Sequence, residues 1–278
     1  MKTIIVPTDF SPISINAVNY AADMAGSINA DLLLLHIYMV PGIYGEVPYT
    51  IQGLESSSLV ADAEKAIEQL KIKLEKRTSG KINISTEVIV AASVLAELQQ
   101  FCNSRKPYAV VMGTQGSTAV ERFFFGSNTI GAMKHLAWPL VIVPPEAKFT
   151  DIKRIGLACD MRDVDKSIPF SEIRLLVKQF DAELFILHIN AEGEKGFTID
   201  KAIESRSMQE MLDDLQPVYR FLDDEDIESA LEKFAEANKL DLLLVVPKRH
   251  NIIDTLFHKS HSKKMVLQTH IPLMAIHN

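Results

Sequence analysis

The sequence has 278 residues and a formal net charge of −7, with 47% hydrophobic and 23% charged side chains. This balance is typical of a globular protein, and it excludes a disordered chain and a strongly basic binder of nucleic acid or anionic membranes. With one cysteine in each half, Cys102 and Cys159, the sequence predicts a reduced protein without disulfides.

The apolar runs of the sequence have the length of strands. Leu32–Leu35 and Leu242–Val246 are examples, and runs of this size are too short to span a bilayer. Met1–Thr3 leads directly into a strand pattern, which leaves no room for the apolar region of a signal peptide. We therefore expect a cytoplasmic protein without a membrane partner.

The first half alternates strand and helix patterns along the chain. In order, the segments are a strand Thr3–Thr8 followed by Asp9, a helix Ser14–Ser27, a strand Asp31–Tyr38, a helix Ser56–Lys76, a strand Ile82–Val90, a helix Ser93–Asn103, a strand Tyr108–Met112, a helix after Ser127 and a strand Pro139–Val143. Between the second strand and its helix, Met39–Gly53 is rich in Pro, Gly and Tyr, which suggests a lid or partner surface.

The second half repeats this order. Its segments are a strand Lys153–Cys159 followed by Asp160, a helix Ser167–Phe180, a strand Glu183–Asn190, a helix Asp200–Asp214, a strand Val218–Leu222, a helix Ile227–Asn238, a strand Leu240–Pro247, a helix Ser260–Thr269 and a strand Ile271–Ile276. The Pro-Pro segment 144–148 separates the copies. The predicted fold class is α/β, with two tandem doubly wound domains, residues 1–147 and 148–278, each with a five-stranded parallel sheet.

A glycine-containing loop follows the fourth strand of the first half. The run Met112-Gly113-Thr114-Gln115-Gly116 is followed by Gly126-Ser127-Asn128-Thr129, and nine residues separate Gly116 from Gly126. Glycines let the backbone approach a phosphate closely, and a helix start with Ser and Thr hydroxyls supplies donors. Ser127 is also a suitable N-cap for the following helix. Ligands of such sheets bind beyond the carboxyl ends of the strands, where Asp9 also lies, although Asp9 fits the alternative role of a helix N-cap.

At these motifs the sequence resembles the universal stress protein family in its tandem two-domain form. The matching pieces are Val6–Ser11, Leu35-His36-Ile37 and the spacing Gly-x2-Gly-x9-Gly-Ser-Asn over Gly113–Asn128. The resemblance implies Rossmann-like domains that pair with each other through their last strands, with a homodimer as a further option. It also implies binding of ATP or AMP, with Mg²⁺ as a further option, and a stress-response role with a protein partner that the sequence does not identify.

The resemblance assigns roles to individual residues of the first half. Asp9 would meet the adenine or ribose edge, Pro7 and Thr8 would shape the wall, and Ile37 would offer its backbone to adenine. Met112, Gly113, Gln115 and Gly116 would line the ribose and phosphate path. Gly126, Ser127, Asn128 and Thr129 would hold the phosphates.

The second half departs from this motif. It has Val246-Pro247-Lys248-Arg249-His250 in place of Met-Gly-Thr-Gln-Gly, and Lys259-Ser260-His261 opposite Gly126-Ser127-Asn128, with an intervening loop one residue shorter. All three glycines are absent, so the second domain is expected not to bind a nucleotide. The basic side chains there leave anion binding as an alternative to a solvated loop.

No catalytic or metal motif stands out. The pair His258-x2-His261 lacks further ligands for zinc, and His36 and His188, at matching positions, are expected to be satisfied packing residues. Arg122, between the glycines, suits either phosphate contact or a solvated loop. The sequence therefore predicts a nucleotide-binding regulatory protein rather than an enzyme. The alternatives are a ligand-free interaction scaffold and a slow ATP-hydrolysing or nucleotidyl-transfer enzyme.

Overall fold

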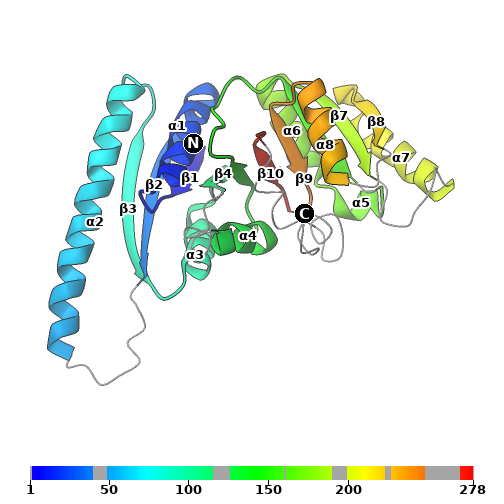
Figure 1. The fold of residues 1–278 in the computed structure, drawn as a ribbon. Coiled ribbons are helices and arrows are strands. Elements are labelled where there is room, and N and C mark those ends of the chain that lie inside the picture. The colour runs from blue at the N-terminus through cyan, green and yellow to red at the C-terminus, as the bar shows by residue number, and fades with distance from the viewer. Residues whose placement is uncertain are drawn as a thin grey trace. The chain divides into compact units, whose positions relative to one another are not determined.

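The chain divides into two compact units, Met1–Phe149 and Thr150–Asn278 (Figure 1). The computed structural model describes residues 2–39, 49–114, 126–159, 161–189, 199–222, 227–247 and 270–277. Each unit is an α/β domain built around a parallel sheet, as the alternation of strand and helix patterns predicted.

The first unit alternates strands and helices throughout. Its elements are β1 (Thr3–Pro7), α1 (Pro12–Ile28), β2 (Asp31–Met39), α2 (Tyr49–Arg77), β3 (Ile84–Ala91), α3 (Val94–Arg105), β4 (Ala109–Gly113), α4 (Gly126–His135) and β5 (Leu140–Val143). The strands are all parallel and lie in the order β3-β2-β1-β4-β5. The strand order therefore reverses between β1 and β4, which is where such sheets bind ligands.

The second unit has the same topology. Its elements are β6 (Arg154–Cys159), α5 (Val164–Ser167), α6 (Phe170–Phe180), β7 (Glu183–Ile189), α7 (Ile199–Leu212), a 3₁₀ turn (Asp213–Leu215), β8 (Val218–Leu222), α8 (Ile227–Ala237), β9 (Leu242–Val245) and β10 (Leu273–Ala275). The order β8-β7-β6-β9-β10 reproduces that of the first unit, strand for strand. The predicted five-stranded parallel sheet is thus confirmed in each unit.

Helices cover both faces of the first sheet, which explains why its inner strands β1, β2 and β4 are mainly continuous apolar runs. Thr86 and Glu87 are neighbours on β3 and so point to opposite faces. Thr86 contacts Glu68 of α2 at 3.4 Å, whereas Glu87 pairs with Arg105 of α3 at 3.4 Å. The β1 side chains between these layers are fully buried, and each buried Ile, Leu or Val contributes about 1.5–3 kcal/mol.

Local sequence sets the ends of α1. Ser11 is its N-cap, with the Ser11 hydroxyl accepting the Ser14 N–H, and Pro12 occupies the first turn, where its missing N–H costs nothing. At the other end Asn29 adopts the left-handed conformation with φ 53° and donates its N–H to Ala25. The helix therefore starts immediately beyond the carboxyl end of β1.

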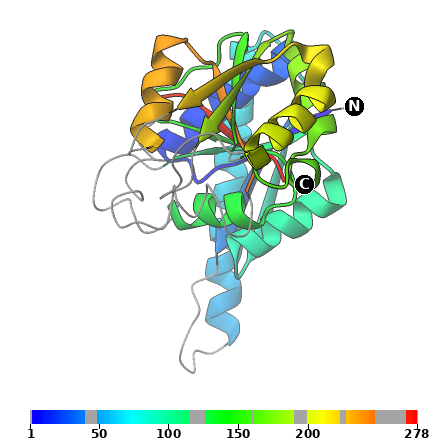
Figure 2. The same ribbon diagram turned by 90° about the vertical axis from the view of Figure 1, so that its right-hand side faces the viewer.

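Two predicted helices differ from those observed. Helix α2 begins at Tyr49, so the end of the predicted lid Met39–Gly53 is helical, while residues 40–48 lie outside the described part. With 29 residues α2 is about 44 Å long and projects past the sheet (Figure 2). The predicted helix Ser167–Phe180 is instead two helices, α5 and α6, because Pro169 disfavours a helical conformation at Ile168.

The segment after β5 is bound to the first unit. The Asn16 side-chain amide donates to the carbonyl oxygens of Pro144 and Ala147 at 3.0 and 3.1 Å. The Phe149 ring meets Tyr20 edge to face, with centroids 5.3 Å apart. The segment 144–149 is therefore attached to helix α1 by these contacts.

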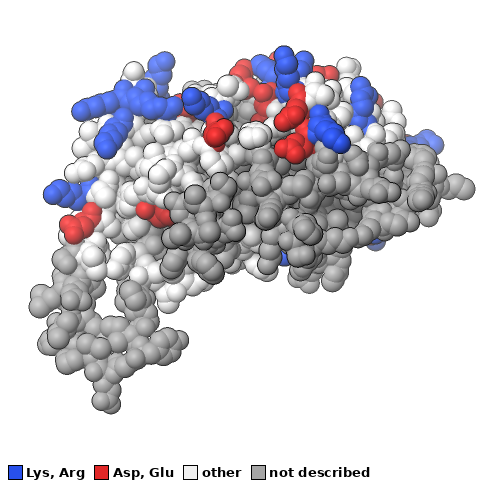
Figure 3. Space-filling view, viewed as in Figure 1, with Lys and Arg blue, Asp and Glu red and all other residues white. Residues whose placement is uncertain are grey.

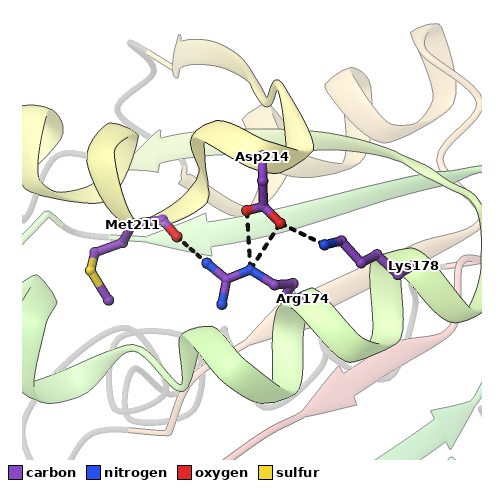
Figure 4. A network of polar contacts seen from close by, with 4 residues as sticks. All are labelled: Arg174, Lys178, Met211 and Asp214. Atoms are coloured by element: carbon purple, nitrogen blue, oxygen red, sulfur yellow. Dashed lines mark hydrogen bonds and ion pairs between the residues drawn. The ribbon is translucent and has the colours of Figure 1, made fainter.

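In the second unit, one carboxylate joins α6 to the end of α7. Asp214 accepts from Lys178 at 2.7 Å and from Arg174 at 3.0 Å, and Arg174 also donates to the Met211 carbonyl (Figure 4). The hydrogen bonds from Lys178 and then Arg174 lower the pKa of Asp214. All these groups are solvent-exposed, so the network holds two helices in register more than it stabilises the fold.

Candidate functional site

The carboxyl end of β1 leads into a turn that is held by Thr8. The Thr8 N–H continues the β1–β2 ladder by donating to the Leu35 carbonyl at 2.8 Å. Its hydroxyl contacts the Ser14 hydroxyl at 3.0 Å and accepts the Phe10 N–H at 3.1 Å. Thr8 is buried, with 3% of its surface exposed. Thr8, which was predicted to shape the wall of the site, therefore holds this turn through hydrogen bonds inside the protein.

Asp9 lies on the outside of this turn. Its side chain is exposed, and one carboxylate oxygen accepts the Ser11 N–H at 3.1 Å, which orients the carboxylate. The N-cap of α1 is Ser11, so the alternative role of Asp9 as the N-cap is wrong. The next residue, Phe10, has φ 65°, an uncommon conformation for an aromatic residue.

On β2, the backbone of Ile37 lies beyond the last residue pair with β1. That pair joins Pro7 to Leu35, and Leu35 directs its carbonyl toward β1. Because alternate residues of a strand direct their backbone groups to the same side, Ile37 also presents its N–H and C=O toward β1. Pro7 is the last residue of β1, so these groups of Ile37 are not part of the ladder.

Gly113 is the last residue of β4 and lies next to the first turn of α1. A Cβ at this position would lie 2.6 Å from the Ile13 Cγ2 and 2.9 Å from the Ile13 carbonyl oxygen. Only glycine therefore allows β4 and α1 to approach this closely. Met112, just before it, is fully buried, so its side chain belongs to the core and only its backbone lies near the edge.

Helix α4 starts next to the end of β4. The Thr129 hydroxyl, buried in its first turn, donates to the Gly113 carbonyl at 3.3 Å. The helix begins at Gly126, so Ser127 lies inside the first turn, and its predicted N-cap role is wrong. Asn128 is half-buried in the same turn. The start of α4 thus lies beside the carboxyl end of β4.

Thr114, which the sequence analysis did not assign, is a further polar residue at this edge. Its N–H donates to the Val143 carbonyl at 2.9 Å, and its side chain is 2% exposed. The Thr114 Oγ1 has no hydrogen-bond partner among the described residues. A buried hydroxyl without a partner is uncommon in folded proteins. Its position directly after Gly113 was the available signal.

Several predicted contacts lie outside the described residues. These include Gln115, Gly116 and Arg122 in the first half, and Asp160, Lys248, Arg249, His250, His258, Lys259, Ser260 and His261 in the second. For Gly126 and Ser127 only the backbone is described. The described part of the site is thus formed by the ends of β1, β2 and β4 and the start of α4.

Among the described residues of the first unit, basic side chains gather around the carboxyl end of α2, away from this edge. Lys76, Arg77 and Lys81 lie there (Figure 3). Cations there complement the helix dipole. The segments at the carboxyl edge, 8–14, 37–39, 113–114 and 126–129, contain no Lys or Arg. An anion bound to these segments would therefore be held by backbone N–H groups and hydroxyls.

The two histidines on the second strands have different surroundings. The His36 Nδ1 lies 2.7 Å from the Thr8 carbonyl oxygen, and its ring packs against the tilted ring of Phe10 with centroids 4.8 Å apart. His188 is buried, with its ring 5.5 Å from that of Phe221. The prediction that His36 is a satisfied packing residue is confirmed.

The second unit keeps the turn after its first strand but changes the chemistry. Met161 occupies the position of Phe10 and has the same left-handed conformation, with φ 51°. Its N–H donates to the Cys159 Sγ at 3.3 Å, as the Phe10 N–H does to the Thr8 hydroxyl. A thiol thus replaces the hydroxyl in an otherwise equivalent turn.

The strand registers correct the sequence alignment of the two loops. The N–H of Val110 donates to the carbonyl of Pro139, and the N–H of Leu243 donates to that of Pro272. Val110 and Leu243 are therefore equivalent, and three residues later Val246 corresponds to Gly113. The predicted alignment is one residue out, and the two loops have the same length. The second unit thus has a buried valine where the first has no room for a Cβ.

Comparison with known proteins identifies the fold family. The family model described as "Universal stress protein family" matches residues 1–144. The chain belongs to the universal stress protein family. The resemblance inferred from the motifs is thereby confirmed.

Relatives of this universal stress protein include single-domain and full-length matches. Universal stress protein MJ0531 of Methanocaldococcus jannaschii is 26% identical over 147 residues, which are 53% of this chain and 84% of the relative. A universal stress protein structure from Archaeoglobus fulgidus has a TM-score of 0.69 and 16% identity, covering 99% of this chain and 96% of its own. A putative universal stress protein from Pseudomonas aeruginosa has a TM-score of 0.56 and 10% identity, covering 100% and 93%. These structures match the fold over both units.

Two further observations concern the described residues of this universal stress protein. They contain no group of three or more His, Cys, Asp or Glu side chains arranged to hold a metal ion. None of their helices is both long and apolar enough to cross a membrane.

Proposed function

We propose that this universal stress protein binds one adenine nucleotide, ATP or AMP, in its first unit, and that the second unit binds none. The observation that carries the proposal is the buried Thr114 hydroxyl, which has no partner among the described residues and lies at the edge where the strand order reverses. A polar ligand atom at this edge would satisfy that hydroxyl.

The remaining groups suit the parts of a nucleotide. The Ile37 backbone presents a donor and an acceptor beyond the end of β1, the pattern that the edge of adenine requires. Asp9, held by Ser11, would accept hydrogen bonds from the ribose. The start of α4, with Gly126, Ser127 and Asn128, would hold the phosphates together with the loop that contains Gly116. With Asp9 as the one carboxylate among the described residues of this edge, Mg²⁺ would be held mainly by phosphate and water.

We further propose a regulatory role in the stress response, acting on a protein partner, rather than catalysis. Hydrolysis requires a positioned base, and the titratable side chains in segments 8–14 and 36–37 are Asp9 and His36. In the proposed arrangement Asp9, held by Ser11, meets the ribose, and His36, bonded to the Thr8 carbonyl, lies beside the adenine edge. Neither side chain is therefore placed as a base at the terminal phosphate.

The second unit lacks the features that support binding in the first. Val246 takes the place of Gly113, and equal loop lengths put Arg249 and Lys259 at the positions of Gly116 and Gly126. Side chains at all three positions obstruct the close approach of backbone to phosphate. We therefore expect one nucleotide per chain.

Titration calorimetry of the stripped chain with ATP, and separately with AMP, in the presence of Mg²⁺ tests the proposal. We expect one site per chain, absent in Gly126→Val and retained in the matched variant Lys259→Val at the equivalent position of the second unit. Two sites would contradict the assignment of the second unit. Absence of binding by the unmodified chain would favour a ligand-free interaction scaffold.

A further inference from the structure

We infer that His36 is a positioning residue of the nucleotide site, which sets the Ile37 backbone and the Asp9 turn at a fixed separation. This inference rests on the proposed function, because it concerns the same edge of the first sheet. It assigns a role to a side chain that makes no contact with the nucleotide itself.

The first step of the argument is the hydrogen bond that His36 makes. Its Nδ1 lies 2.7 Å from the Thr8 carbonyl oxygen. A carbonyl only accepts, so Nδ1 carries the hydrogen, which fixes the tautomer of the neutral ring. The bond joins β2 to the first residue after β1, at the point where the backbone ladder stops.

The second step is what this bond replaces. The Thr8 N–H donates to the Leu35 carbonyl, so the next bond of a parallel ladder would run from the Ile37 N–H to the Thr8 carbonyl. No such backbone bond is present among the described residues, and the imidazole occupies that carbonyl instead. His36 thereby ends the ladder and leaves the Ile37 N–H directed toward the space where adenine is proposed to bind.

The third step is the packing of the ring on the turn. The His36 ring packs against Phe10 at a tilt of 33°, with centroids 4.8 Å apart, and Phe10 has a left-handed backbone with φ 65°. That conformation is unfavourable for a non-glycine residue, so other contacts must hold it. The Thr8 hydroxyl accepts the Phe10 N–H from one side, and His36 packs from the other. Asp9 is the residue between Thr8 and Phe10 in the chain.

These contacts make a rigid connection between two groups on different strands. The hydrogen bond fixes Thr8 relative to β2, and the ring contact fixes Phe10, so the position of Asp9 relative to Ile37 follows. Preorganised groups lose less freedom when a ligand binds, which appears as higher affinity. Without the Nδ1 donor, we expect the Ile37 N–H to bond the Thr8 carbonyl and the edge for adenine to close.

Amide variants of His36 separate this role from simple packing. In His36→Asn the side-chain NH₂ lies near the position of Nδ1 and can still donate to Thr8. In His36→Gln the NH₂ lies near the position of Nε2 and does not reach that carbonyl. Both variants are polar and similar in size, and their melting temperatures are compared with that of the unmodified chain. Exposed His135, at the far end of α4, provides the control variant His135→Gln.

Calorimetric titration with ATP should give affinities for His36→Asn and His135→Gln within about threefold of the unmodified chain. The His36→Gln variant should bind roughly tenfold more weakly, which corresponds to the loss of one hydrogen bond. Equal affinities for the Asn and Gln variants would overturn the inference. Failure of the unmodified chain to bind ATP would instead refute the proposed function.

A second measurement does not depend on the variants. A long-range ¹H–¹⁵N spectrum of the nucleotide-free chain should show the His36 ring protonated on Nδ1. A ring protonated on Nε2 alone cannot donate to the Thr8 carbonyl and would also overturn the inference.

Discussion

The close approach of β4 to α1 at Gly113 gives a sharp prediction for Gly113→Ala. The new methyl group would lie 2.6 Å from the Ile13 Cγ2, which a rotation of the Ile13 side chain can relieve. It would also lie 2.9 Å from the Ile13 carbonyl oxygen, which belongs to the first turn of α1 and cannot move alone. Overpacking of this kind costs about 1–3 kcal/mol, and the backbone contact places the cost near the middle or above, about 2 kcal/mol.

The assay for this prediction uses the single tryptophan. Trp138 lies in the first unit, so its fluorescence during denaturant unfolding reports that unit alone. For a domain of this size, a loss of about 2 kcal/mol lowers the melting temperature by roughly 4–8 °C.

A matched substitution in the same unit should have the opposite sign. Gly26 lies in α1, and a Cβ there meets only the Ile82 Cγ2, at the ordinary contact distance of 3.9 Å. Gly26→Ala should therefore stabilise the unit by about 0.5–1 kcal/mol through helix propensity. If Gly113→Ala proves as stable as the unmodified chain, the tight contact with Ile13 is absent in solution and the reasoning fails.

Three further predictions concern polar groups. Thr114→Val should raise the unfolding free energy of the nucleotide-free chain by about 1 kcal/mol, because it removes a buried hydroxyl without a partner among the described residues. It should also weaken ATP binding in calorimetry. An unchanged ATP affinity would show that Thr114 is not part of the site. Asp214→Asn should slightly destabilise the second unit at neutral pH. Because the pKa of Asp214 is lowered in the folded chain, the difference in unfolding free energy from the unmodified chain should vanish as the pH falls from about 4 through that pKa. It should also vanish in high salt, and circular dichroism can follow both effects. A difference that does not depend on pH would exclude the ion pairs as its cause. Cys102 and Cys159 are both buried, and burial raises the pKa of the Cys102 thiol to about 12. Neither cysteine should therefore react with a thiol reagent at neutral pH until denaturant is added. Rapid reaction of the folded chain would contradict this prediction.

The order of helices and strands was predictable because each element has its own local hydrophobic pattern in the sequence. Buried parallel strands give continuous apolar runs such as Leu32–Leu35, and intervening helices give amphipathic periods, so both copies were recognised from sequence. The break between α5 and α6 was missed from the sequence, although Pro169 was the available signal because a proline restricts the residue before it. The start of α2 at Tyr49 was not predicted, because a Gly- and Pro-rich stretch favours a loop locally.

The parts of the site that sequence missed are contacts between distant residues. The His36–Thr8 bond joins residues on neighbouring strands, and the Gly113–Ile13 approach joins a strand end to a helix start. Neither leaves a spacing pattern in the chain. The position of Val246 opposite Gly113 likewise required strand register, because the proline-anchored count allowed a one-residue gap in the loop.

The hydrogen bonds of Asn16 determine where the first unit can be truncated. The match to the family model ends at residue 144, and β5 ends at Val143. A chain cut there would lose the Ala147 carbonyl that accepts from the Asn16 amide, together with the Phe149 ring that covers Tyr20. A half-buried amide would lose an acceptor, and an aromatic surface of the core helix would be uncovered. An independently folding first unit therefore has to be expressed through Phe149, five residues beyond the family boundary.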